Sequence, residues 1–333
     1  MSKALLQMKA TAVAPSNIAF TKYWGRKNEK LRLPENGSIS MSLSNLLTTT
    51  TVEFSDKYKR DQVVIDGKEI KEEVERTIKH LDRIRKLANI PYKANVVSQN
   101  NFPSGTGLSS SSSGFAALTL AATSAAGLNL SAKELSILAR TASGAACRSI
   151  PGGFVEWMDG NTSDTSFAKT IFSKNHWAIA DMVAVVSEHK KEVPTSEGHM
   201  GAQSSPFIKL RLSHMKKKNN LAKKLIKSKN FKEFGELIES EALELHAIMI
   251  TQTPHLIYWT PGTLRIMKLV SRWRAEGLPV YFTINTGQDI HLIVEQKNID
   301  KVKTKLKKLD FVKNIIVNYP GEGARLVKKS DLF

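Results

Sequence analysis

Residues 102–114 read FPSGTGLSSSSSG and stand between a predicted strand at 92–99 and a predicted apolar helix at 115–126. The three glycines of this stretch allow the backbone to curl so that successive N–H groups point toward one centre. The helix that follows adds the N–H donors and the positive dipole of its N-terminus. Five consecutive hydroxyls, from Ser109 to Ser113, supply further donors. The stretch therefore predicts a loop that binds polyphosphate, together with a metal ion carried by the phosphates.

A flexible Gly/Ser linker is the alternative interpretation of this composition. We disfavour it because a linker does not normally stand between a strand and a long Ala-rich helix. The loop also differs from a Walker loop, since no Gly-Lys-Ser/Thr sequence follows it.

Strands and helices alternate on both sides of this loop. Apolar residues three and four apart predict a helix at 71–88, and Ser131 with Glu134 is a capping-box pattern at the start of another. Further strands are expected at 8–20, 41–54, 63–65, 182–187, 280–284, 289–295 and 312–318, and further helices at 206–249, 261–275 and 299–309. This mixture predicts the α+β class, and the length favours two domains, 1–190 and 191–333.

The composition excludes several classes of protein. One cysteine in 333 residues rules out a disulfide framework and a Cys-based zinc site, and it favours a reducing compartment. The eight histidines are scattered, so we expect no dedicated metal site built from protein side chains. No segment approaches the roughly 20 apolar residues that span a bilayer. We expect a cytoplasmic protein with no membrane partner.

The net charge of +18 comes from 49 Lys and Arg against 31 Asp and Glu. Ten of these cations lie between Lys209 and Lys232 without an acidic residue, and a second lysine cluster lies at 301–308. A nucleic-acid surface and a solvated helical face both fit this pattern. Aromatic residues for base stacking are almost absent from the first cluster, so we expect the solvated face and consider nucleic acid an unlikely partner.

Two further segments bear on anionic ligands. Lys22, Arg26 and Lys27 place three cations within six residues, beside Tyr23 and Trp24. A pocket for a second, smaller anion and a strand end with solvated lysines explain this segment equally well.

Arg148 follows a run of small residues, which suits an arginine held for bidentate contact with an oxyanion. Its neighbour Cys147 has no base near it in the sequence, so a buried structural thiol is favoured over a nucleophile.

Taken together and in this order, these segments resemble the GHMP kinase superfamily and, more narrowly, the mevalonate diphosphate decarboxylase family. The matching text is APSNIA at 14–19, KYWG at 22–25, LPEN at 33–36, NNFP at 100–103, GL at 107–108, SG at 143–144, ACRS at 146–149 and GGF at 152–154. The resemblance covers about residues 12–295. It implies a two-domain GHMP kinase fold, with a first domain like domain 2 of ribosomal protein S5, a ferredoxin-like second domain, and a homodimer.

The resemblance also implies an activity, the ATP- and Mg²⁺-dependent decarboxylation of mevalonate 5-diphosphate to isopentenyl diphosphate in isoprenoid biosynthesis. Family members phosphorylate the tertiary 3-hydroxyl, and loss of the new phosphate and of CO2 gives the product. Two related activities stay open: decarboxylation of mevalonate 5-phosphate to isopentenyl phosphate, and decarboxylation of mevalonate 3,5-bisphosphate without ATP. An inactive relative that binds RNA or other anions through the lysine-rich helices is the alternative of a different class.

The family's functional residues transfer to this chain by motif. The resemblance implies that the ATP phosphates are bound by Pro103, Ser104, Gly105, Thr106, Gly107, Leu108, Ser109, Ser110 and Ser112. It implies a substrate pocket formed by Lys22, Tyr23, Trp24, Arg26, Arg83, Ser143 and Arg148. The candidate catalytic residues are Lys22, Ser111 and Asn285.

The chain departs from the family pattern at three places. Arg26 replaces a lysine, Ala145 replaces a serine, and the family's Asp-Ala-Gly-Pro-Asn is here NTGQD at 285–289. An amide cannot take a proton, so Asn285 can position the 3-hydroxyl without acting as a general base. Asp289 is expected to point elsewhere. Phosphoryl transfer by positioning alone, or a substrate already phosphorylated, would remove the need for a carboxylate.

Overall fold

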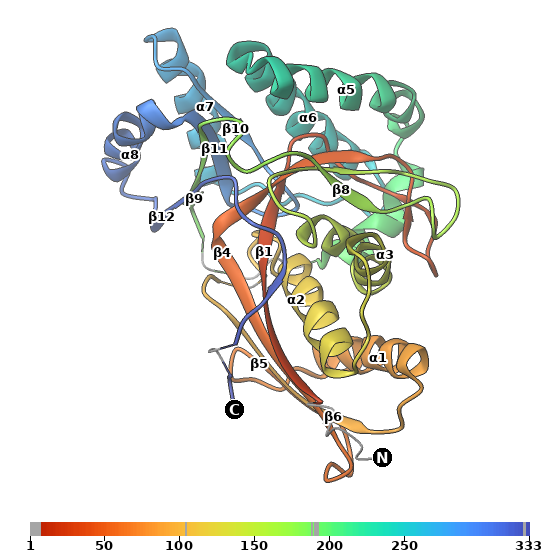
Figure 1. Ribbon diagram of the computed structural model, residues 1–333. Helices are drawn as coiled ribbons and strands as arrows, with labels where there is room; N and C mark the ends of the chain where they lie inside the picture. The colour runs from red at the N-terminus through yellow and green to blue at the C-terminus, as the bar shows by residue number, and fades with distance from the viewer. Residues whose placement is uncertain (1–7, 104, 188, 190–192, 329–330) are drawn as a thin grey trace.

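The computed structural model describes residues 8–103, 105–187, 189, 193–328 and 331–333. Two main sheets, each with its own helices, account for most of the chain (Figure 1). Strands and helices are mixed in both halves, which confirms the predicted α+β class. Within these ranges, no helix combines the length and the apolar character needed to cross a membrane.

The first sheet is built around one long strand. It contains β13 (Arg325–Leu326), β1 (Lys9–Ala19), β4 (Ser38–Ser55), β6 (Lys93–Asn100) and β5 (Gln62–Ile65) in that order. In addition, β7 (Phe154–Trp157) pairs with β4, and β8 (Ala168–Phe172) pairs with β7. The Ser-, Thr- and Val-rich sequence of β4 suits an extended strand that pairs with β1, β6 and β7. A bulge between Pro15 and Asn17 interrupts the β1–β4 ladder, because proline has no N–H to donate.

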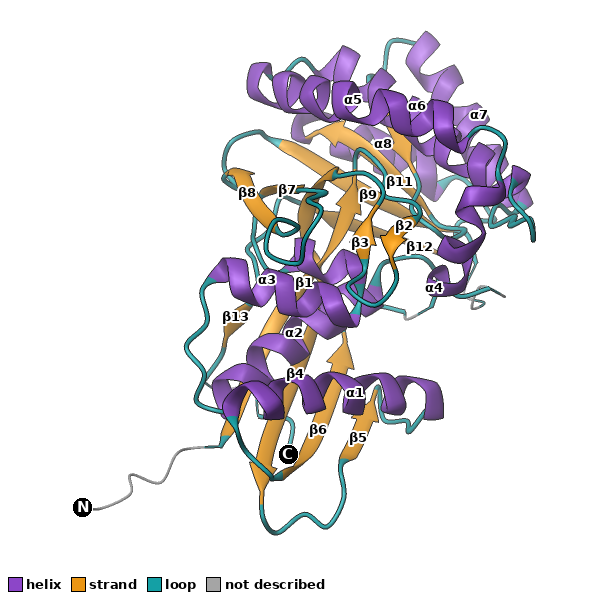
Figure 2. Ribbon diagram, turned by 90° about the vertical axis from the view of Figure 1, so that its right-hand side faces the viewer, coloured by secondary structure: helices purple, strands orange, loops and turns teal. Residues whose placement is uncertain are grey.

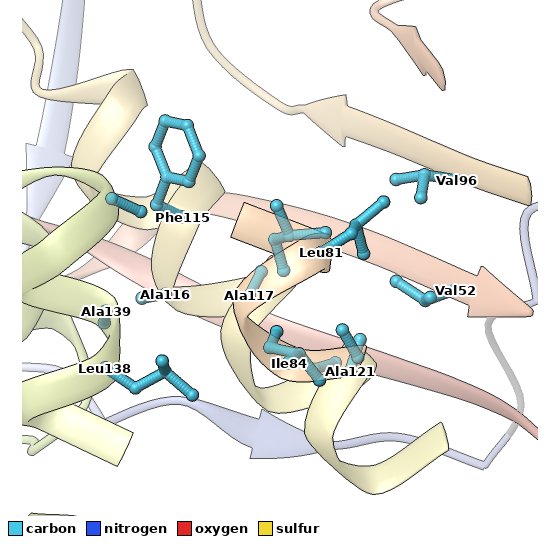
Figure 3. Close-up of a cluster of buried hydrophobic side chains, with 14 of the residues drawn as sticks. Val52, Leu81, Ile84, Val96, Phe115, Ala116, Ala117, Ala121, Leu138 and Ala139 are labelled. Atoms are coloured by element: carbon cyan, nitrogen blue, oxygen red, sulfur yellow. The ribbon is translucent and has the colours of Figure 1, made fainter. Parts of the chain in front are cut away.

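Three helices cover one face of this sheet: α1 (Lys71–Ala88), α2 (Ser110–Ala125) and α3 (Ala132–Ala142) (Figure 2). The capping box of Ser131 and Glu134 begins α3 as predicted. Alanines of α2 such as Ala117 and Ala121 are fully buried between the sheet and side chains of α1 such as Leu81 (Figure 3). This packing explains why the segment is apolar and uncharged.

The second sheet has the order β10 (Val280–Thr283), β11 (Ile290–Glu295), β9 (Ile179–Val185) and β12 (Asn314–Asn318), all antiparallel. Both faces of β9 are buried. Met182 faces α7 (Pro261–Ala275) and α8 (Ile299–Lys307), whereas Val183 faces α5 (Ile208–Ser228) and α6 (Phe231–Thr251). Short helices complete the fold: η1 (Gly144–Ser149), α4 (Thr195–Gly198), η2 (His199–Ser204) and η3 (Gln296–Asn298), with a small hairpin of β2 (Arg26–Asn28) and β3 (Leu33–Pro34).

Sheet membership changes between β8 and β9, before the domain boundary predicted at residue 190. The strand expected at 182–187 is β9, and it pairs with β11 and β12 rather than with the first sheet. The short β13 near the C-terminus returns to pair with β1. Residue 190 itself lies outside the described residues, and the division into 1–190 and 191–333 stays a prediction.

The lysine-rich segments form α5, the start of α6 and most of α8. Lys218 pairs with Glu241 and Glu244 of α6, and Lys223 pairs with Glu156 of β7 at 2.6 Å. Part of this positive charge is therefore balanced by acidic side chains far away in the sequence.

Candidate active site

A cavity of about 470 Å³ lies where the serine-rich loop, the 22–32 segment and the 285–287 turn meet. The predicted site residues that line it are Lys22, Tyr23, Arg26, Gly105, Gly107, Ser109, Ser110, Ser111, Ser112, Ser143, Arg148 and Asn285. Residues 14–30, 102–114, 143–149 and 285 are far apart in the sequence, and the fold brings them to one place. A smaller cavity of about 90 Å³ shares Ser110, Ser111 and Arg76 with it.

The backbone of the serine-rich loop has the conformation that phosphate binding requires. Gly105, Gly107 and Ser109 have positive φ angles of 82°, 112° and 59°. Helix α2 then begins at Ser110, five residues before the start that its apolar pattern predicts, so the serines form its first turn. No side chain caps this end and the first turn holds no acidic residue. The Ser112 N–H donates to the Ser109 carbonyl at 2.8 Å, so the N–H groups that precede it are the donors that suit an anion.

Contacts from three directions hold this loop in place. Ser16 Oγ donates a hydrogen bond to the Leu108 carbonyl at 2.5 Å, and Asn285 Nδ2 donates to Ser109 Oγ at 3.2 Å. Gly107 packs directly on Gly287. Their backbones lie so close that a Cβ added to Gly107 would be only 2.6 Å from the Cα of Gly287. The loop is therefore fixed against the 285–289 turn of the second half.

Some predicted loop residues lie outside the cavity lining. Pro103 is exposed, while Thr106 and Leu108 are buried behind the loop. Ser104 lies outside the described residues. From residue 105 to residue 108 the loop alternates between half-buried glycines and buried side chains, so Thr106 and Leu108 point toward the protein interior.

Lys22 is fully buried and lines the cavity. Its Nζ donates hydrogen bonds to the Ala19 carbonyl at 2.7 Å and to Asn285 Oδ1 at 3.4 Å. Burial holds the pKa of Lys22 well below its usual range, although Glu241 acts in the opposite direction.

Arg148 is a second buried cation in the cavity, positioned by the 3₁₀ helix η1 that follows α3. Its Nη1 donates to Ser38 Oγ at 2.9 Å, and its Nε has no partner among the described residues. A buried guanidinium without a carboxylate beside it suits an anionic ligand. The neighbouring Cys147 is also buried, and burial raises the pKa of its thiol to about 12, which excludes a thiolate nucleophile at neutral pH.

Ser111 and Ser143 form a hydrogen-bonded pair in the lining of the cavity. Their Oγ atoms are 3.4 Å apart, which joins the first turn of α2 to the C-terminal end of α3. Both hydroxyls line the cavity, between the phosphate loop and Arg148.

An aromatic wall closes one side. The ring of Tyr23 stacks on His199 with centroids 4.3 Å apart and meets Trp157 edge-on at 4.6 Å. Trp24, which we expected to line the pocket, is fully buried behind this wall, where its Nε1 donates to Gln252 Oε1 at 2.9 Å. His199, which lines the cavity, carries no signal in the sequence that would have identified it.

Three arginines converge on the cavity from the β2–β3 hairpin and α1: Arg26, Arg32 and Arg76. The pKa of Arg32 is lowered to about 10. Burial is the largest cause, and the positive charges of Arg26 and Arg76 lower it further. Sequence reasoning missed Arg32 and Arg76. It selected Arg83 on α1, which is exposed and lies outside the lining, because helix position alone does not tell which turn faces the site.

The 285–289 turn carries a carboxylate that does not reach the cavity. Asp289 Oδ1 accepts a hydrogen bond from the Val186 N–H at 3.0 Å, and burial raises the pKa of Asp289 to about 6. Asp289 is thus absent from the lining, as expected, whereas Asn285 is present. The carboxylates that do line the cavity are Glu72 and Glu73 at the start of α1.

The cavity suits a nucleotide better than a bare metal ion. Within the described ranges, no three or more His, Cys, Asp and Glu side chains are grouped to hold a metal. Mg²⁺ commonly keeps several waters and binds through substrate phosphates. The uncapped N-terminus of α2 and the loop N–H groups fit such phosphates, and the phosphates would then carry the ion.

Comparisons with family profiles and with known proteins agree on one family. A family profile described as "Diphosphomevalonate decarboxylase-like N-terminal domain" matches residues 14–168, and one described as "Mevalonate 5-diphosphate decarboxylase C-terminal domain" matches residues 181–326. The diphosphomevalonate decarboxylase of Candida albicans is 34% identical over 317 residues, which cover 90% of this chain and 88% of that protein.

Two further relatives bear on the ligands. A solved structure described as "MDDEF in complex with MVAPP, AMPPCP and Magnesium" has a TM-score of 0.91 and 37% identity, and the match covers 96% of this chain and 99% of that one. The phosphomevalonate decarboxylase of Haloferax volcanii is 31% identical, over 89% of this chain and 91% of that protein. The structural likeness confirms the predicted two-domain fold.

Proposed function

The chain belongs to the mevalonate diphosphate decarboxylase family, and from this premise we propose that it catalyses the ATP-dependent decarboxylation of mevalonate 5-diphosphate to isopentenyl diphosphate. The observation that carries the proposal is the single cavity in which an uncapped helix N-terminus faces the buried cations Lys22 and Arg148. A phosphoryl donor and an anionic acceptor can occupy such a cavity side by side.

The charges of the cavity match the charges of this substrate. Arg148 binds the carboxylate, since it is a buried cation whose Nε lacks a partner among the described residues. The arginines Arg26, Arg32 and Arg76 bind the 5-diphosphate. The serine-rich loop and the start of α2 bind the ATP phosphates, and Mg²⁺ carried by those phosphates neutralises part of their charge.

The reaction order follows from this arrangement. ATP transfers its γ-phosphoryl group to the 3-hydroxyl, and Ser111 and Asn285 position that hydroxyl from opposite sides. The carbon–oxygen bond to the new phosphate then breaks, and the carboxylate leaves as CO2. The aromatic wall of Tyr23 and His199 excludes water from the intermediate.

The protein is further proposed to act as a homodimer in the cytoplasm. The family resemblance supports the dimer, and exposed apolar side chains on and beside α5, Phe207 and Leu210, are available to an interface. The single buried cysteine suits a reducing compartment. Sedimentation of the purified protein at several concentrations measures the oligomeric state.

One assay tests the proposed activity. Purified protein is incubated with Mg-ATP and, in separate reactions, with mevalonate 5-diphosphate, mevalonate 5-phosphate and mevalonate 3,5-bisphosphate, while ADP and CO2 are followed. ADP and CO2 released in equal amounts from the 5-diphosphate are expected. Release of CO2 without ADP from the bisphosphate, or no product from any substrate, would reject the proposal.

The 5-phosphate reaction addresses a second candidate activity. The name of the Haloferax volcanii relative and the replacement of the family's aspartate by Asn285 favour including it. A kcat/KM at least tenfold higher for the 5-phosphate would assign the enzyme to that substrate. We expect the reverse, because Arg26, Arg32 and Arg76 line the cavity in addition to Arg148, and a monophosphate cannot engage all three of them.

A further inference from the structure

Lys22 presents an unusual combination of burial and hydrogen bonding. Its side chain reaches the cavity, yet its two hydrogen bonds among the described residues go to the Ala19 carbonyl and Asn285 Oδ1. A neutral amine has two N–H donors and one lone pair, whereas an ammonium has three donors. The two acceptors therefore match the two donors of the neutral form, and its lone pair has no partner among the described residues.

Burial favours the same form, and the charged groups around Lys22 act in both directions. Burial is the largest influence on its pKa and lowers it, and Arg148 on η1 and Arg211 on α5 lower it further. Glu241 on α6 and Asp181 on β9 act in the opposite direction. Glu241 is paired with Arg211 and Lys218, and Asp181 with His291, so neither carboxylate is free for Lys22.

The backbone of Lys22 is held on both sides. Its N–H donates to Glu241 Oε2 at 3.0 Å, and its carbonyl accepts from Arg211 Nη2 at 3.0 Å and from Asn36 Nδ2 at 2.8 Å. Asn285 joins the amine to the phosphate loop, since it accepts from Lys22 Nζ and donates to Ser109 Oγ. The amine is therefore held near the serine-rich loop, where the proposed function places the ATP phosphates.

We propose that Lys22, as a neutral amine, is the general base that takes the proton of the substrate's 3-hydroxyl during phosphoryl transfer. The inference rests on the proposed function and extends it, because Asn285 cannot accept that proton. The hydroxyl oxygen forms a bond to the γ-phosphorus of ATP as the bond to the β-phosphate oxygen breaks, and the proton moves to Nζ. ADP and a 3-phosphorylated intermediate result.

The ammonium formed in that step has a use in the next one. It lies beside the new phosphate, whose departure with its bonding electrons leaves a negatively charged oxygen. Lys22 returns its proton to the departing phosphate when CO2 is lost. The amine is then neutral again for the next turnover, and protons balance over the cycle.

Lysine variants test this assignment. Lys22→Arg keeps a permanent charge and cannot act as a base at neutral pH. We expect it to lower kcat for ADP formation by about 10²–10⁴-fold, with KM for mevalonate 5-diphosphate changed by only a few-fold. Lys22→Gln removes both the base and the ammonium that it forms during the reaction, and it should lose at least as much. Thermal unfolding and calorimetric binding of the substrate verify that each variant folds.

A chemical rescue separates a base from a structural lysine. In Lys22→Cys, alkylation with 2-bromoethylamine produces a lysine analogue whose amine is less basic, while the other cysteine, Cys147, is buried. Wild-type protein treated in the same way is the matched control, and mass spectrometry verifies that Cys147 is unmodified. We expect ADP formation to return, with the rising limb of kcat against pH displaced to lower pH than in the wild type.

The outcomes of these experiments are distinguishable. If Lys22→Arg stays within about tenfold of the wild type, a permanent charge suffices and the base assignment is wrong. A rescued variant whose pH profile coincides with that of the wild type overturns it as well. If the wild type itself releases no ADP from any phosphorylated mevalonate, the proposed function fails rather than the role of Lys22.

Discussion

Arg148 illustrates how one buried cation specifies the ligand of a cavity. It is 5% exposed, it donates to the neutral Ser38 hydroxyl, and its Nε is unpaired within the described part of the chain. Burying a charge without a counter-ion costs several kcal/mol. That cost is offset only when an anion binds, so the residue favours ligand binding over stability.

Replacing Arg148 should therefore separate binding from folding. We expect Arg148→Met to raise the Kd for mevalonate 5-diphosphate by about 10²-fold or more, because a charge pair in a buried site contributes about 2–5 kcal/mol. The free energy of unfolding should not fall, since the cation has no carboxylate partner to lose. Isothermal titration calorimetry and urea unfolding measure the two effects.

Arg83→Met is the matched control for this experiment. Arg83 is an exposed arginine of α1 outside the cavity lining, so its replacement should leave the Kd within about twofold. An equal loss of affinity in both variants would mean that net charge, rather than the buried position of Arg148, determines binding.

Between elements, the contact that matters most is the one between the phosphate loop and the 285–289 turn. Gly107 and Gly287 touch backbone to backbone, and Gly107 has a φ of 112°, a region open to glycine and strained for other residues. The loop belongs to the first half of the chain and the turn to the second. Their contact fixes the serine-rich loop, which is proposed to bind the ATP phosphates, relative to Asn285.

A methyl group at position 107 should disturb nucleotide binding selectively. Gly107→Ala is expected to raise KM for ATP at least tenfold, with a smaller effect on KM for mevalonate 5-diphosphate, because the loop must move away from Gly287. Gly277→Ala is the control, since Gly277 also has a positive φ, 87°, but its Cβ would meet nothing within 4 Å. Steady-state kinetics that do not distinguish the two variants would contradict this role of the contact.

The helix pair α5–α6 supports the site through a buried ion pair. Glu241 is fully buried and accepts from Arg211 Nη2 at 3.1 Å. Burial alone would raise the pKa of Glu241, but Arg211 and Lys218 more than offset this and bring it to about 2. The ionised pair holds both backbone groups of Lys22.

Removing one member of this pair should destabilise the protein. We expect Glu241→Gln to lower the free energy of unfolding by about 3–5 kcal/mol, because Arg211 loses its buried counter-ion. Glu244→Gln, the half-exposed partner of the same cations, should cost less and serves as the control. Recovery of stability in an Arg211→Met, Glu241→Leu double variant would verify that the uncompensated charge is the cause.

The depressed pKa of Glu241 also sets a pH dependence. The folded form of this carboxyl has a lower pKa than the unfolded form, so its contribution is complete above about pH 4.5. The contribution declines as the pH falls toward 2. Urea unfolding of the wild type and of Glu241→Gln should therefore converge in acid.

The molecule as a whole places its active site between two sheets. A shared core joins them: Ile18 and Phe20 of the first half pack with Val183 of β9 and Phe234 of α6. Because this core is continuous, the cavity above it has walls from both halves. Positions far apart in the sequence, such as Ser111 and Asn285, are then held at fixed separation.

Acid should weaken this whole structure through buried histidines. Burial lowers the pKa of His80 and of His246 to about 3, so the unfolded chain binds their protons first as the pH falls below about 6.5. Each histidine contributes stability that is complete above pH 6.5 and is lost toward pH 3. The raised pKa of Asp289, about 6, acts in the opposite direction over part of this range.

His80→Gln should reduce this pH dependence. We expect the slope of the unfolding free energy between pH 4 and 6 to fall by about 1.4 kcal/mol per pH unit, the effect of one proton. His255→Gln is the control, since His255 is exposed. Urea unfolding at several pH values measures the slope, and an unchanged slope in His80→Gln would show that His80 is already protonated in the folded state.

Local patterns determined much of this structure before any tertiary information. The period of apolar residues placed α1 at 71–88, and the capping box placed the start of α3. The phosphate-binding role that the Gly/Ser composition predicts for the loop stays a prediction. These features depend on neighbours within a few residues along the chain. The sequence also shows that Asn285 replaces the family's aspartate, and an amide at this position cannot act as a general base.

Tertiary packing determined which side chains share the cavity. Arg76 rather than Arg83 lines it, Trp24 lies behind the wall instead of in it, and Arg32 joins from the β2–β3 hairpin. The helical period shows which residues share one side of a helix, but it does not show which part of that side faces the cavity. The pKa of Lys22 likewise depends on burial and on charged groups from four separate elements, so it follows from the folded arrangement rather than from the local sequence.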